Sequence, residues 1–138
     1  MAERPDAVET ALRALRFRDR SAAELAARLE QHGFDGAEQE EALATLARIG
    51  YVDDARFARA RAEQLAERGS GDALIRDDLE RRGLAADVVE LALGVLEPER
   101  ERAARIAEHR GCTVKTARYL ASRGFGEDAL EVVVAVDD

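Results

Sequence analysis

Six arginines form three pairs in which the members stand three residues apart: Arg13 and Arg16, Arg56 and Arg59, Arg102 and Arg105. Residues three apart lie on one face of a helix, so each pair would present two guanidinium groups together. A guanidinium suits the two-pronged binding of carboxylates and phosphates. If the helices that carry them stack in parallel, the pairs predict a ladder of binding groups along one side. The alternative is that they are solvated helix faces balanced by neighbouring Asp and Glu.

Residues 50–58 carry a helix stop and a helix start back to back. Gly50 is placed to end one helix in a left-handed turn. Asp53 is placed to cap the next helix by accepting from backbone N–H groups near Arg56, and Asp54 adds negative charge to its first turn. Adjacent carboxylates can also bind a divalent ion, but no third ligand is at hand. We therefore interpret both carboxylates as helix-capping groups.

Two aromatic residues, Tyr51 and Phe57, bracket this junction. Such residues lie in the core more often than they stack on the bases of a nucleic acid. The closeness of Tyr51 to the pair Arg56 and Arg59 keeps a partner-binding role open for it.

The residues that could perform catalysis are isolated from one another. His32 and His109 stand alone, and Cys112 has a histidine three residues back but no Asp or Asn that would complete a triad. The chain has neither a glycine-rich phosphate loop nor a His/Cys cluster with zinc spacing. We expect no enzymatic activity, no cofactor and no metal.

Composition points to well-solvated helices. Of the 138 residues 46% are hydrophobic, only 4% are aromatic and 36% are charged, with a net charge of −8. This balance argues against a simple nucleic-acid binder. No apolar run approaches the ~20 residues that span a bilayer, the first residues lack a signal-peptide pattern, and the single cysteine excludes an internal disulfide. We expect a cytoplasmic monomer that has no membrane contact.

A pattern of helix and terminal glycine repeats along the chain. The segment from Leu25 to Phe34 recurs as Ile75 to Leu84, and more faintly as Thr116 to Phe125. In each copy an apolar residue precedes the glycine by four positions and another follows it directly, as at a helix that ends in a left-handed glycine. The glycines stand 50 and 41 residues apart, which is typical of a helical repeat array.

The repeat divides the chain into three units, at residues 1–50, 51–96 and 97–138. Each unit reads as three helices, so we predict an all-α fold made of three tandem three-helix repeats. Capping pairs predict two of the helix starts, at Ser21 with Glu24 and at Asp35 with Glu38, and Pro98 suits a first helical position. The last segment, rich in Val, has strand propensity, but the repeat favours a helix.

These motifs together resemble the RecX family, bacterial regulators of the RecA recombinase. The resemblance is carried by Ser21-x-x-Glu24-Leu25-x-x-x-Leu29-x-x-x-Gly33-Phe34, by Gly50-Tyr51-Val52-Asp53-Asp54-x-x-Phe57-Ala58 and by Ile75-x-x-x-Leu79-x-x-x-Gly83. It covers roughly residues 7–96 well and the remainder by length and repeat order. It implies an elongated, curved array that binds in the groove of the RecA–DNA filament and restrains filament growth, ATP hydrolysis and strand exchange.

Three functional hypotheses follow. In the first, the chain modulates the RecA nucleoprotein filament by protein contact, with DNA secondary, and the arginine ladder and Tyr51 meet acidic groups of RecA or phosphates of filament DNA. In the second, a helix-turn-helix-like regulator binds DNA, but the helices after Gly33 and Gly83 begin with acidic residues that phosphates would repel. The third is a generic helical adaptor with another partner.

Overall fold

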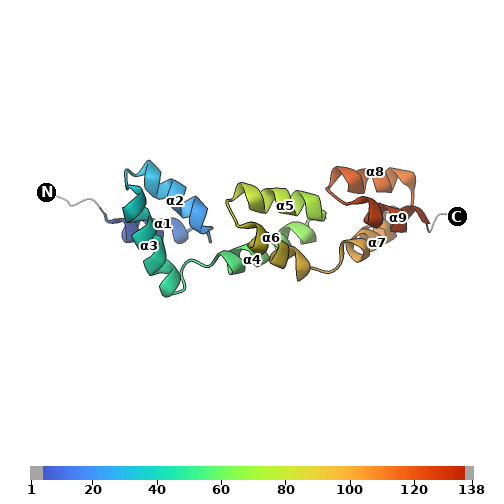
Figure 1. The fold of residues 1–138 in the computed structure, drawn as a ribbon. Coiled ribbons are helices and arrows are strands. Elements are labelled where there is room, and N and C mark those ends of the chain that lie inside the picture. The colour runs from blue at the N-terminus through green and yellow to red at the C-terminus, as the bar shows by residue number, and fades with distance from the viewer. Residues whose placement is uncertain (1–4, 136–138) are drawn as a thin grey trace.

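The structure, a computed structural model, describes residues 5–135, and each regular element in that range is an α-helix (Figure 1). The helices are α1 (Ala7–Leu15), α2 (Ala22–Gln31), α3 (Gly36–Arg48), α4 (Asp54–Glu67), α5 (Asp72–Arg81), α6 (Ala86–Gly94), α7 (Glu99–Arg110), α8 (Val114–Ser122) and α9 (Glu127–Ala135). The predicted all-α class is confirmed, and the Val-rich segment is helical as far as Ala135. Residues 136–138 lie outside the described range.

The helices form three units in a row, which we call unit 1 (α1–α3), unit 2 (α4–α6) and unit 3 (α7–α9) (Figure 1). Each unit has its own small core, and the helix pairs that pack extensively belong to the same unit. The fully buried residues of these cores include Leu25 and Leu46 in unit 1, Ile75 and Leu79 in unit 2, and Leu120 in unit 3. Because the cores are separate, the expected tandem array is confirmed. Its curvature stays a prediction.

Local sequence determines where the helices begin and end. Ser21 and Asp35 each complete a capping box, in which the capping side chain accepts from a backbone N–H and the Glu three residues on accepts in return. Gly33 and Gly83 end α2 and α5 with positive φ angles of 87° and 81°, which only glycine adopts without strain. Pro98 differs from its predicted place by one residue, because it is the N-cap of α7 and not its first helical residue.

The second helices α2, α5 and α8 run head to tail along one side of the array (Figure 1). The N-terminal end of α2 meets the C-terminal end of α5, where a Cβ added at Gly83 would lie 2.4 Å from the Cβ of Ala23. The N-terminal end of α5 meets the C-terminal end of α8 in the same way. Each contact places the positive end of one helix dipole at the negative end of the next, which is favourable.

Polar groups connect unit 1 to unit 2, at a contact that we call the first joint. The hydroxyl of Ser21 donates to the carbonyl of Arg82 at 2.7 Å, and the Arg82 guanidinium donates to Glu24 at 3.1 Å. The backbone N–H of Ala22 donates to the Asp54 carboxylate at 2.8 Å. Asp54 therefore caps a helix of the preceding unit across the joint, which the sequence analysis did not foresee.

Backbone groups connect unit 2 to unit 3, at the second joint. The N–H of Gly71 donates to the carbonyl of Arg123 at 2.7 Å, and the N–H of Ala73 donates to the carbonyl of Gly124 at 3.1 Å. A Cβ at Gly71 would lie 2.4 Å from the carbonyl carbon of Gly124 and from the amide nitrogen of Phe125. The two backbone segments can approach this closely only because residue 71 is glycine.

Candidate functional site

Three of the six paired arginines are free for a partner. The side chains of Arg13 on α1, of Arg16 at its C-cap and of Arg59 on α4 are exposed and make no hydrogen bond or ion pair within residues 5–135. Their guanidinium groups therefore keep their full capacity for a carboxylate or a phosphate. Arg13 and Arg16 lie in unit 1 and Arg59 in unit 2, so these groups are spread over two units.

Arg56 is held by its own chain. Its guanidinium donates to the carbonyl of Gly50 at 3.0 Å and approaches the carbonyl of Tyr51 at 3.5 Å. It also pairs with the carboxylate of Asp19 in unit 1 at 3.6 Å. Arg56 therefore fastens the turn between α3 and α4 and links the first two units, although its side chain is still 44% exposed.

Arg102 does not belong to an exposed ladder, and the structure corrects the sequence analysis here. Its side chain is 8% exposed, and it donates to the carbonyls of Glu97 and Ser70 at 2.9 Å each and to the carboxylate of Asp72. Its guanidinium carbon also lies 5.8 Å from the centre of the Phe125 ring. A buried charge requires such a full set of partners. Because Ser70 and Asp72 belong to unit 2, Arg102 links unit 3 to unit 2 and is part of the second joint.

Arg105 keeps its place on the surface, with 61% of its side chain exposed, and pairs with the carboxylate of Glu97. Three of the six arginines thus have acidic partners, and three have none among the described residues. Only Arg56 and Arg105 match the solvated-face alternative, because Arg102 is buried. The helices that carry the pairs, α1, α4 and α7, each pack extensively only inside their own unit. Because Arg102 is buried in the second joint, the six arginines do not all belong to one exposed ladder.

The carboxylates and aromatic residues at the start of α4 have divided roles. Asp53 accepts from the backbone N–H of Arg56 at 3.1 Å, which confirms the predicted cap. Phe57 is 6% exposed and belongs to the core of unit 2, whereas Tyr51 is 54% exposed. Tyr51 thus remains available to a partner.

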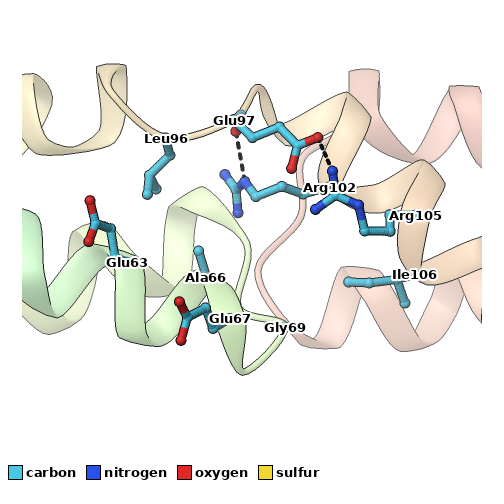
Figure 2. Close-up of a pocket in the computed structure, with 9 residues that line it drawn as sticks. All are labelled: Glu63, Ala66, Glu67, Gly69, Leu96, Glu97, Arg102, Arg105 and Ile106. Atoms are coloured by element: carbon cyan, nitrogen blue, oxygen red, sulfur yellow. Dashed lines mark hydrogen bonds and ion pairs between the residues drawn. The ribbon is translucent and has the colours of Figure 1, made fainter.

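An acidic pocket of about 420 Å³ opens between unit 2 and unit 3. In Figure 2, Glu63 and Glu67 project from α4 on one side, and Arg105 and Ile106 lie on α7 at the other side. Glu63 and Glu67 have no ion pair in residues 5–135, whereas Glu97 pairs with Arg105. This pocket would repel a phosphate and would favour a basic or apolar group.

A smaller groove of about 180 Å³ lies at the first joint, beside a network of charged groups. Arg61 donates twice to the carboxylate of Asp78, at 3.0 Å each, and Arg82 donates to the same carboxylate at 2.9 Å. The hydrogen bond from Arg61, followed by that from Arg82, outweighs burial and lowers the pKa of Asp78 below its ordinary value. The same bond raises the pKa of Arg61. This network was not predicted from the sequence, although the i, i+4 spacing of Asp78 and Arg82 is a signal for it.

The helices that follow the glycine turns present acidic faces. Glu38, Glu40 and Glu41 on α3 are exposed, and so are Asp87 and Glu90 on α6. Among these only Glu90 has an ion pair, with Arg76 at 2.8 Å, and its hydrogen bond with that arginine lowers the pKa of Glu90. A helix that reads base edges would offer Arg, Asn or Gln there instead.

Residues 5–135 contain no group of three or more His, Cys, Asp or Glu side chains that could hold a metal ion. Within the same range no helix is both long and apolar enough to cross a lipid bilayer. His32 is exposed, and Cys112 is a half-buried free thiol between α7 and α8.

Models of two protein domains match the chain, namely the first three-helix domain of RecX at residues 7–46 and the second three-helix domain of RecX at residues 53–93. The Regulatory protein RecX of Halorhodospira halophila is 31% identical over 140 residues, which cover 94% of this chain and 87% of that relative. The chain belongs to the RecX family. Both matched domains lie in units 1 and 2.

Other RecX relatives agree with this assignment. The Regulatory protein RecX of Leptothrix cholodnii is 35% identical over 137 residues, with 93% of this chain and 87% of the relative covered. That of Deinococcus radiodurans is 36% identical over 126 residues, but the chain spans only 60% of that relative's length. A crystal structure of RecX from Lactobacillus salivarius, 17% identical, has a TM-score of 0.81 and covers 94% of this chain and 93% of its own. That likeness supports the three-unit RecX fold.

Proposed function

We propose that this chain regulates the RecA recombinase by binding along the RecA–DNA filament and restraining filament growth, ATP hydrolysis and strand exchange. Its RecX relatives are named regulatory proteins. The observation that carries the proposal is the row of three separately cored units joined by polar contacts (Figure 1). Such a row offers contact points along its length, which suits a partner that itself repeats along an axis.

The contacts to RecA are made by exposed arginines on successive units. Carboxylates on the filament surface are bound by Arg13 and Arg16 in unit 1 and by Arg59 in unit 2. Tyr51, exposed just before the start of α4, adds a further contact. Each exposed ion pair is weak, at about 0.2–1 kcal/mol. Several of them on one array add up through effective concentration, so the whole chain binds more tightly than any unit would.

Inhibition in this proposal is steric and not enzymatic. The array lies in the groove of the filament, spans neighbouring RecA protomers and occupies space that a second DNA strand needs. It also resists the subunit motions that accompany ATP turnover. Direct DNA contact is secondary, because the net charge is −8 and both α3 and α6 present acidic faces. The protein then acts where RecA acts, in the cytoplasm during recombination and DNA repair.

The test is the ATPase rate of RecA on single-stranded DNA with and without this protein, beside its binding to naked single-stranded DNA. We expect a lower rate without appreciable binding to naked DNA. A charge reversal at Arg13, Arg16 and Arg59 to Glu should abolish the effect. The matched control reverses Arg68, Lys115 and Arg118, which are exposed and unpaired within the described residues, and should keep it. Equal inhibition by both variants, or tight salt-sensitive binding to naked DNA with an unchanged ATPase, would overturn the proposal.

A further inference from the structure

The two joints share one chemical feature, which concerns the first turn of a second helix. At the first joint Glu24, in the first turn of α2, accepts from Arg82 of unit 2 at 3.1 Å. At the second joint Asp72, the first residue of α5, accepts from Arg102 of unit 3. In both places, an arginine of the following unit holds a carboxylate from the N-terminal turn of the preceding second helix.

The corresponding end of unit 1 is not covered by another of the three described units. In Figure 1 the C-terminal end of α2 points away from unit 2, toward the N-terminal end of the row. A pocket of about 310 Å³ opens there, which we call the end pocket. Its lining residues are Pro5, Thr10, Arg13, Arg28, His32 and Phe34.

The end pocket is basic, whereas at the joints the positive and negative side chains balance one another. The repeat aligns His32 with Arg82 and Arg28 with Asp78. In unit 2 the carboxylate of Asp78 compensates its arginines within the unit. Arg28 takes the place of that acid in unit 1. Among the described residues, no lining residue of the end pocket is acidic, and neither Arg13 nor Arg28 has an ion pair. The described lining of the pocket therefore carries positive charge that no described acid compensates.

We infer that the end pocket is a docking site for an acidic segment of another protein, presented as the first turn of a helix with an Asp or Glu. The repeat itself argues for this occupant, because both joints receive such a carboxylate. A second copy of this chain does not fit. Its free second-helix N-terminus, at α8, has no acidic residue in the first turn and carries Lys115 instead. The inference does not require that RecA be the partner.

The probe is a fluorescein-labelled, alanine-based helical peptide that begins Ser-Glu-Glu-Glu, titrated with the full chain and followed by fluorescence anisotropy. Arg28→Glu should weaken binding by about tenfold and Arg28→Gln by less, because reversal adds repulsion to the lost attraction. The control Arg118→Glu makes the same charge change on an exposed, unpaired residue of α8 and should bind the peptide normally. Circular dichroism of all variants should match the wild type.

Three results would overturn the inference: absence of peptide binding to the wild type, equal weakening by Arg28→Glu and Arg118→Glu, or preference for a phosphate ligand. The last is checked with a labelled oligothymidine of 18 nucleotides. Binding of the oligonucleotide that Arg28→Glu abolishes, without binding of the peptide, would make the end pocket a nucleic-acid site. Because neither probe contains RecA, these outcomes are independent of the ATPase test above.

Discussion

Gly71 gives the sharpest test of how the units are coupled. It is the N-cap of α5, with φ −84° and ψ 173°, so alanine can adopt its backbone conformation without strain. The effect of Gly71→Ala must therefore come from the added methyl group alone. That group would lie 2.4 Å from atoms of Gly124 and Phe125 that belong to the backbone and cannot move aside as the end of a flexible side chain could.

The cost follows from the geometry of the second joint. Non-bonded carbon atoms lie about 3.5 Å apart, so the two backbones must separate by roughly 1 Å. The hydrogen bond from Gly71 to Arg123, now 2.7 Å, would then be stretched beyond the normal bonding range, and so would that from Ala73 to Gly124. Loss of the two bonds, which leaves the N–H of the buried Gly71 unsatisfied, costs about 2–4 kcal/mol. The lower entropy of the unfolded alanine chain recovers about 0.4–1 kcal/mol.

Urea unfolding followed by circular dichroism measures this cost. Because each unit has its own core, loss of coupling should lower the cooperativity of the transition as well as the stability of unit 3. Gly36→Ala is the matched control, since a Cβ at Gly36 would meet no atom within 4 Å, and it should be neutral or slightly stabilising. If Gly71→Ala unfolds as cooperatively as the wild type and at the same urea concentration, the close contact at the second joint does not couple unit 2 to unit 3.

Other changes test the same joints. Arg102→Met should lower the free energy of unfolding by about 3–5 kcal/mol, because it leaves the buried partners of the guanidinium unpaired. The control Arg100→Met, on the exposed face of α7, should change the free energy of unfolding by no more than about 0.5 kcal/mol. Urea unfolding measures both. Ser21→Ala removes both a helix cap and the hydrogen bond across the first joint, and should lower the free energy of unfolding by about 1–3 kcal/mol. The control Ser122→Ala, at an exposed position, should change it little when both variants are unfolded by heat. The pKa of Asp78 is lowered in the folded state, so its contribution is present above the unfolded pKa of about 3.9 and is lost as pH falls through the folded pKa. The stability gap between the wild type and Asp78→Asn should therefore shrink at acid pH, and a gap that stays constant would contradict this.

Local chemistry made the helices predictable from the sequence. Capping boxes at Ser21 and Asp35 and the left-handed glycines act within a few residues, so their patterns can be read directly. The joints could not be read in this way. The bond from Ala22 to Asp54 and the contact of Gly71 with Gly124 join residues far apart in sequence, and no periodicity marks them.

The candidate site was predictable only in part. Sequence spacing placed Arg102 and Arg105 on one helix, but it could not show that Arg102 turns into a joint between units while Arg105 stays on the surface. Spacing defines a face of a helix, whereas burial depends on the neighbouring unit. The end pocket could not be predicted from the sequence either, because its lining residues come from separate segments that only the fold brings together.

The central claim is that the array binds the RecA filament through contacts spread over its units. Co-sedimentation with RecA filaments assembled on single-stranded DNA tests it most directly, with naked single-stranded DNA of the same length as the reference. We expect the protein to pellet with filaments but not with naked DNA, and the variant with Glu at Arg13, Arg16 and Arg59 to stay in the supernatant. Recovery of the folded wild-type protein in the supernatant with filaments, or equal pelleting with naked DNA, would contradict it.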